Sequence, residues 1–121
     1  MPRAALFVLD LALVGLFAVL GRLSHYDSLS LEGWWTTAWP FLLGTILAWV
    51  VLVLAHRSVH HIEAGVIVWL VTLVGGMMLR LASDQGTALP FVIVATLVLG
   101  LFLVLPRVGL LLVQRSANSA R

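Results

Sequence analysis

Polar residues at two matched places give this apolar sequence its clearest candidate for chemistry. Arg22 and Arg80 each end an apolar run, and Thr37 and Thr87 each open the next one, in the motifs TAWPF and TALPF. Guanidinium groups and the free N–H groups of a helix N-terminus both favour anions. If the motifs begin helices, two arginines and two helix N-termini meet at one level. The pattern therefore predicts an outward-facing site for a small anion or an anionic lipid headgroup. His25 either contributes to this site or simply lies at the membrane interface.

Each part of this predicted site also has a structural interpretation. An arginine at a helix end can reach the lipid headgroups and pair with an aspartate of the following loop. Proline is favoured in the first helical turn, where N–H groups have no partner within the helix, and a nearby threonine can cap them. Both motifs therefore predict that helices begin at or just before Pro40 and Pro90, with or without a ligand.

Asp10 is the only acidic residue inside an apolar run. A carboxylate within the bilayer costs about 2.5–3.5 kcal/mol on insertion scales, so such residues usually have a partner or a task. Arg22 lies about 18 Å away along a helix and is too far to be that partner. We expect an ion pair or hydrogen bond with Arg57 or Arg107, and relay of protons is the alternative.

The segment between the second and third apolar runs contains a histidine cluster. His56 and His60 are four residues apart and Glu63 follows, which is a spacing that can bind a metal on a helix. The segment is a short connection, however, so helical spacing need not apply there, and we expect a solvated loop. No pattern calls for a metal or another cofactor, and no nucleophile–base pair indicates an enzyme.

Composition determines which elements must position these residues. The chain is 62% hydrophobic and 10% charged, with mean hydropathy +1.13, whereas soluble domains are about 45–50% apolar and about 25% charged. The sequence therefore predicts an all-α, polytopic membrane protein in a lipid bilayer, and the net charge of +2 is too small to indicate a nucleic-acid partner. We expect a single domain over residues 1–115 with spans of about 4–21, 38–56, 63–80 and 88–106, then a short polar tail over 116–121. The fourth helix ends near Arg107 or near Val113.

The distribution of arginines predicts the orientation in the membrane. Positive residues favour the cytoplasmic side, and five arginines lie on the side that holds both termini, against two on the other side. The five are Arg3, Arg57, Arg107, Arg115 and Arg121. We therefore expect a multi-pass protein of the cell inner membrane with both termini in the cytoplasm.

The two motifs also raise the question of an internal repeat. Residues 37–57 align without a gap on residues 87–107, from the threonine of each motif to an arginine. Two copies of one helical hairpin, related by a pseudo-twofold axis along the membrane normal, would explain this match. Chance similarity between apolar helices is the other explanation. Small residues at Gly44, Ala48, Gly75 and Gly76 favour close helix packing, within one bundle or in a homodimer.

Several motifs along the chain occur together in one pattern: Asp10, Gly21-Arg22, Ser24-His25, TAWPF at 37–41, Trp69, Gly76-Met77, Leu79-Arg80, Gly86-Thr87-Ala88 and Phe91-Val92. This pattern resembles a family of small actinobacterial four-helix membrane proteins, domain-of-unknown-function family number three thousand fifty-four. The resemblance covers nearly the whole chain. It implies a membrane protein and no particular activity.

Two functions fit the sequence. The first is a small transporter or channel-like protein with the anion or anionic-lipid site described above. The second is a non-catalytic membrane subunit that packs against a larger protein partner.

Overall fold

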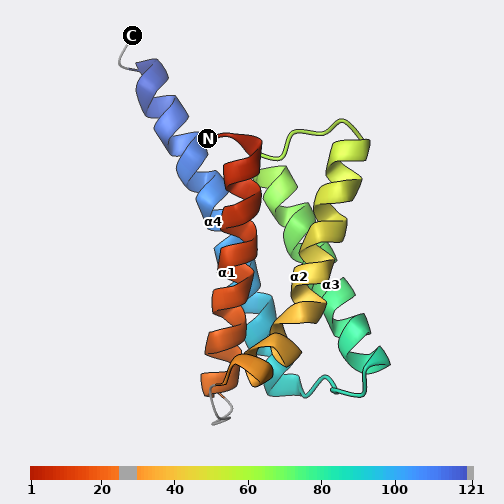
Figure 1. Cartoon of the computed structure of the whole chain (residues 1–121). Coiled ribbons are helices and arrows are strands. Elements are labelled where there is room, and N and C mark those ends of the chain that lie inside the picture. Colours follow the sequence, from red (N-terminus) through yellow and green to blue (C-terminus); the bar gives the residue numbers. More distant parts are fainter. Residues whose placement is uncertain (25–29, 120–121) are drawn as a thin grey trace.

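Four long α-helices form an antiparallel bundle in the computed structural model (Figure 1), which describes residues 1–24 and 30–119. They are α1 (Arg3–Ser24), α2 (Leu31–Leu54), α3 (Ile62–Ala82) and α4 (Leu89–Ser119). Each is long and apolar enough to cross a membrane, and no strand occurs in the described part of the chain. The predicted all-α, four-helix membrane architecture is therefore confirmed, and the chain is a multi-pass membrane protein.

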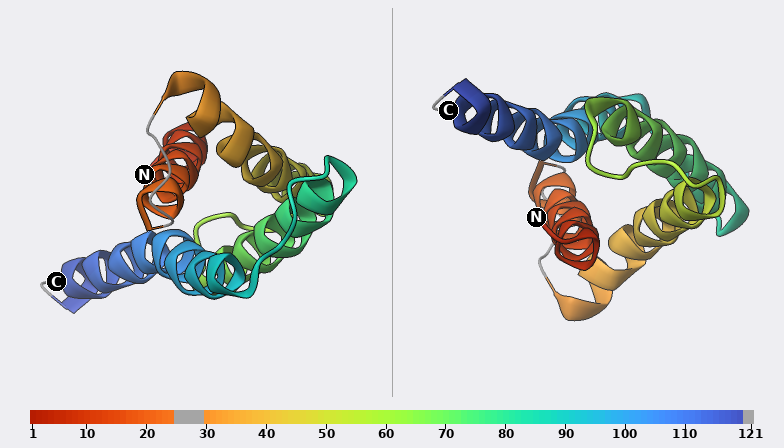
Figure 2. Two further views of the ribbon diagram at one scale, coloured as in Figure 1. Left: turned by 90° about the horizontal axis from the view of Figure 1, so that it is seen from below. Right: turned by 90° about the horizontal axis from the view of Figure 1, so that it is seen from above.

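The helices close into a ring in which each one packs on two neighbours (Figure 2). α1 and α3 both contact α2 and α4, so they lie diagonally across the bundle. α1 and α3 end at one end of the bundle, where α2 and α4 begin; we call this the Arg22–Arg80 end. The opposite end holds both chain termini and the α2–α3 connection (Figure 1), and we call it the terminal end.

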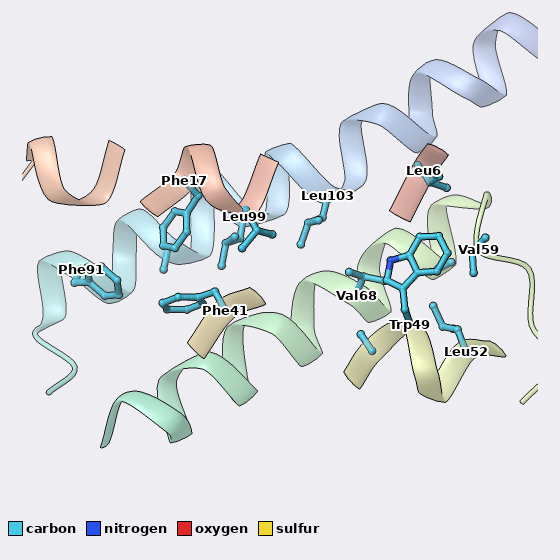
Figure 3. Packing of buried hydrophobic residues seen from close by; sticks show 14 residues of the cluster. Leu6, Phe17, Phe41, Trp49, Leu52, Val59, Val68, Phe91, Leu99 and Leu103 are labelled. Carbon is cyan, nitrogen blue, oxygen red and sulfur yellow. The ribbon is translucent and has the colours of Figure 1, made fainter. Parts of the chain in front are cut away.

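Apolar side chains fill the space between the helices along its whole length. Phe17, Phe41 and Phe91 lie toward the Arg22–Arg80 end, and Trp49 and Leu52 toward the terminal end (Figure 3). Many large apolar side chains on the outer faces remain exposed. Since lipid tails would cover them, this distribution is that of a bundle whose solvent is the bilayer.

α2 begins earlier than the sequence predicts. The Ser30 hydroxyl caps the helix by accepting a hydrogen bond of 3.0 Å from the Gly33 N–H, so the prediction of a helix start near Pro40 is wrong. Pro40 instead lies inside α2, where its missing N–H breaks one backbone hydrogen bond and favours a bend. Figure 1 shows the first turns of α2 running obliquely across the Arg22–Arg80 end before the helix enters the bundle.

α4 begins as expected and ends later than expected. Pro90 is its second residue, a position in the first turn that proline favours. The helix continues through Pro106 to Ser119, so the predicted ends near Arg107 and Val113 are both wrong, and residues 116–119 of the expected tail are helical. Losing one hydrogen bond at Pro106 does not stop a helix whose neighbouring turns remain bonded. At 31 residues, α4 is about 46 Å long and projects past the other helices (Figure 1).

α2 and α3 make the most extensive helix contact of the bundle, and glycines face each other across it. A Cβ atom on Gly44 would lie 3.1 Å from the Thr72 Cα atom, and one on Gly76 would collide with the Phe41 ring. Phe41 is fully buried, so its ring has little room to move away. The predicted role of these glycines in close helix packing is therefore fulfilled within the bundle.

Candidate functional site

A buried ion pair joins the first and last helices near the terminal end. Arg107 Nη2 lies 2.9 Å from Asp10 Oδ2, and Arg107 Nη1 lies 3.0 Å from Asp10 Oδ1. Both side chains are 0% exposed. The two parallel bonds form the bidentate geometry that makes arginine–carboxylate pairs strong. The prediction of a partner for Asp10 is confirmed, and of the two arginines proposed for it the partner is Arg107.

The other two helices and the α2–α3 connection complete this cluster. Trp49 of α2 donates its indole N–H to Asp10 Oδ2 at 2.8 Å, and the Val59 carbonyl accepts from Arg107 Nε at 2.9 Å. α3 contributes space: a Cβ atom on Gly65 would lie 2.6 Å from Arg107 Cδ. We refer to Asp10, Trp49, Val59 and Arg107 as the ion-pair cluster.

The hydrogen-bonding capacity of the ion-pair cluster is nearly used up. Arg107 also donates to the Leu103 carbonyl at 2.8 Å, so its five N–H groups make four bonds, and the Asp10 oxygens accept three. A buried charge is tolerable only when it is paired and bonded in this way. Replacing such a pair by apolar residues is often neutral or stabilising, so the presence of the pair favours a role beyond stability.

Two threonine hydroxyls form a second buried polar contact, between α2 and α3. Thr45 Oγ1 and Thr72 Oγ1 are 2.9 Å apart, and both residues are 0% exposed. Thr45 also donates its hydroxyl proton to the Phe41 carbonyl at 2.9 Å. Because a hydroxyl has only one proton, Thr72 is then the donor in the bond between the two threonines. Polar groups buried in a membrane bundle satisfy one another across helices in this way.

At the Arg22–Arg80 end, Arg22 binds the start of α2. Its Nη1 donates to the Gly33 carbonyl at 3.2 Å and to Thr37 Oγ1 at 3.4 Å. Thr37 is therefore buried inside α2 and does not cap a helix N-terminus as predicted, because α2 begins six residues earlier. His25, the other predicted member on this side, lies outside the described residues.

Arg80 binds the connection that follows it. It donates to Gln85 Oε1 and to the Gly86 carbonyl, both at 3.0 Å, and its guanidinium carbon lies 4.2 Å from the Phe91 ring centroid, in cation–π range. Gln85 thus takes the place that we expected a loop aspartate to occupy. Thr87 lies in the same connection, just before α4.

The two arginines reach the same end of the bundle, where Phe91 links their helices. A Cβ atom on Gly21, the neighbour of Arg22, would lie 3.4 Å from the Phe91 ring on which Arg80 sits. The N-termini of α2 and α4 both lie at this end, but that of α2 is at Leu31 and not at the predicted position near Pro40.

The histidine segment connects α2 and α3 and is largely exposed, as predicted. Arg57 forms an exposed ion pair with Glu63 at 2.5 Å, and the His60 ring contacts the Met1 carbonyl at 2.7 Å. Within residues 1–24 and 30–119, no group of three metal-ligating side chains comes together.

The sequence analysis missed Trp49, Val59, Thr45 and Thr72 as polar partners. For Trp49, no local signal in the sequence distinguishes an indole that only packs from one that also donates a hydrogen bond. The four-residue steps from Thr37 through Phe41 and Thr45 to Trp49 place these residues on one face of a helix. This periodicity indicates a shared face for Thr45 and Trp49, but it does not identify their partners.

Two open hollows among the described residues lie toward the terminal end. One of about 800 Å³ lies between the α2–α3 connection and the end of α4, lined by Ser58, His60, His61 and Gln114 among others. The other, of about 450 Å³, is an apolar groove between α1 and α2. Neither is lined by Arg22 or Arg80.

Comparison with known proteins identifies the family. A family model described as "Protein of unknown function (DUF3054)" matches residues 7–110, which include the ion-pair cluster and both arginines of the Arg22–Arg80 end. No curated protein and no solved structure matches the chain. The match confirms the resemblance drawn from the motifs, and it covers most of the chain: the protein belongs to the DUF3054 family.

Proposed function

We propose that the protein is a small membrane transporter or channel-like protein that takes up an anion, or the headgroup of an anionic lipid, at the Arg22–Arg80 end. The observation that carries this proposal is a row of buried polar contacts along one face of α2. Thr37, Thr45 and Trp49 share this face, and each contacts a side chain of α1 or α3.

The row of polar contacts extends over a large part of the membrane thickness. Thr37 and Trp49 are twelve residues apart, which corresponds to about 18 Å along a helix, or more than half of a hydrocarbon core of about 30 Å. At one end of the row stands Arg22, bound to Thr37, and at the other stands Arg107, bound to Asp10. An anion would therefore meet a cation at each end and two hydroxyls between them.

Three aromatic rings interrupt the row between Thr37 and Thr45. Phe41 lies 5.0 Å from Phe17 and 5.9 Å from Phe91, measured between ring centroids, and the three buried rings lie together between the helices toward the Arg22–Arg80 end (Figure 3). The described conformation is thus closed. Passage of a solute requires these rings to rotate or the helices to separate, as in alternating access.

The ion-pair cluster closes the terminal end in the same conformation. Its bonds hold α1, α2, α4 and the α2–α3 connection together, so the terminal end opens only if the Asp10–Arg107 pair is broken. An incoming anion could replace the Asp10 carboxylate as the partner of Arg107, which would lower the cost of that opening. In this scheme Asp10 is the coupling carboxylate.

Native mass spectrometry of gently extracted protein tests the binding step, because it detects a retained ligand of any mass. The wild type is compared with Arg22→Gln/Arg80→Gln and with Arg57→Gln/Arg115→Gln, which removes the same charge at the terminal end. We expect a lipid or small anion that is retained by the wild type and the control, and lost in the first variant. Identical adducts in all three proteins would contradict the proposal.

A second candidate function is a subunit that packs against a membrane protein partner. The observation that favours it is the projecting end of α4, where Leu112 and Val113 are 59% and 69% exposed. This function predicts one protein that co-purifies in stoichiometric amount from native membranes and is lost when residues 112–119 are deleted. Retention of that partner by the shortened chain would exclude the α4 end as its contact.

We further propose that both termini are cytoplasmic in the inner membrane. Arg3, Arg57, Arg107 and Arg115 belong to the terminal end, and of the described arginines only Arg22 and Arg80 belong to the other end. This distribution supports the orientation inferred from the positive-inside rule.

A further inference from the structure

We propose that the groove between α1 and α2 binds one anionic phospholipid of the leaflet at the terminal end, with its phosphate at Arg3 and one acyl chain along the groove. This site is separate from the anion site proposed above at the Arg22–Arg80 end. The groove has a volume of about 450 Å³ and is lined by Arg3 and Phe7 of α1 and by residues of α2, namely Ile46, Trp49, Val50, Val53 and Leu54.

The apolar part of the groove fits an acyl chain. Apart from Arg3, its lining is entirely aliphatic or aromatic, and Val50 and Val53 are 46% and 38% exposed on the lipid-facing side. From Leu54 to Ile46 the groove runs for about 12 Å at 1.5 Å per residue. This length is close to half of a hydrocarbon core of about 30 Å, which is the depth that one leaflet contributes.

Arg3 supplies the charge that selects the headgroup. It is the first residue of α1 and is exposed, and its side chain makes no hydrogen bond or ion pair with any residue in the described part of the chain. Two other arginines of the terminal end already have acidic partners: Arg107 pairs with Asp10, and Arg57 pairs with Glu63. The N-terminal end of α1 adds the partial positive charge of a helix N-terminus. A lipid phosphate at this level would interact favourably with both the Arg3 side chain and the N-terminus of α1.

The floor of the groove connects this lipid to the ion-pair cluster. Phe7 packs edge-on against Trp49, with ring centroids 5.1 Å apart. Trp49 is among the residues that line the groove, and it donates its N–H to Asp10 inside the bundle. An acyl chain in the groove therefore packs on the outer side of the residue that orients the Asp10 carboxylate, and a bound lipid restricts the motion of Trp49.

Competition between two lipids of equal chain length tests the proposal. The wild type, Arg3→Gln and Arg115→Gln are each equilibrated with equimolar phosphatidylglycerol and phosphatidylcholine, and the lipids retained are counted by native mass spectrometry. Arg115 is exposed near the end of α4 and its variant is the matched charge control. We expect the wild type and Arg115→Gln to prefer phosphatidylglycerol at one site by about five-fold, as one basic residue at the surface allows, and Arg3→Gln to show no preference.

Three outcomes would overturn the proposal. If all three proteins show the same preference, Arg3 does not bind the headgroup. If Arg3→Gln and Arg115→Gln lose the preference equally, the preference comes from overall charge and not from the groove. A fourth protein, Val50→Trp, fills the groove without changing charge and should retain one lipid fewer than the wild type; an unchanged count would show that no chain occupies the groove.

Discussion

Breaking the Asp10–Arg107 pair from one side should be far more costly than removing it entirely. In Asp10→Ala, Arg107 keeps only its bonds to the Val59 and Leu103 carbonyls, and a cation that is 0% exposed loses its counter-charge. The Trp49 N–H loses its acceptor as well. Removing one partner of a buried pair costs about 3–5 kcal/mol, and we expect that loss in the free energy of unfolding.

The variant Asp10→Leu/Arg107→Met removes both charges and keeps apolar volume in their place. Replacements of this kind are often neutral or stabilising by about 1–4 kcal/mol, so the double variant should be at least as stable as the wild type. Arg57→Met is the control for losing an arginine of an ion pair, because its pair with Glu63 is exposed, with side-chain exposures of 57% and 72%. An exposed pair contributes about 0–1 kcal/mol.

Circular dichroism during reversible unfolding in mixed micelles measures the four proteins side by side. A loss of less than about 1 kcal/mol in Asp10→Ala would refute the burial argument, as would a double variant no more stable than the single one. The same proteins separate structure from function. If the double variant is stable but loses the ligand interaction of the wild type, the charges act in function; if it keeps that interaction, the pair only holds the bundle together.

Three further predictions concern packing, hydrogen bonding and orientation. Gly76→Ala should lower the free energy of unfolding by about 1–3 kcal/mol, since its Cβ atom collides with a buried ring, whereas Gly75→Ala, which meets its nearest atom at 3.7 Å, should be tolerated; equal losses in the two variants would contradict the close contact. In a double-mutant cycle, Thr45→Val and Thr72→Val should show a coupling of about 0.6 kcal/mol, and additive effects would mean that the hydroxyls do not interact. The chain has no cysteine, so Ser116→Cys introduces a unique thiol that a membrane-impermeant reagent should label only from the cytoplasmic side; labelling of intact cells from outside would reverse the proposed orientation.

The sequence by itself determined the class of protein and the existence of the four helices. Hydropathy over about 20 residues is a local property, and in a bilayer it leaves the helix as the only way to satisfy the backbone of an isolated span. The start of α4 could also be predicted, because Pro90 restricts its own first turn. The need of Asp10 for a partner could be predicted as well, since an unpaired carboxylate in a membrane span is costly whether it faces the lipid or the interior of the bundle.

The tertiary structure decided which residues meet. Arg57 and Arg107 were equal candidates for Asp10 in the sequence, and Arg107 is the partner because it points into the bundle beside Gly65, while Arg57 lies in the exposed connection. The TAWPF motif predicts a helix start at Pro40, but α2 begins earlier because Ser30 caps it and Arg22 of α1 binds Thr37. Pairing of side chains depends on how each helix is rotated about its axis and which neighbour it faces. Those quantities arise from packing the whole bundle, and no local stretch of sequence contains them.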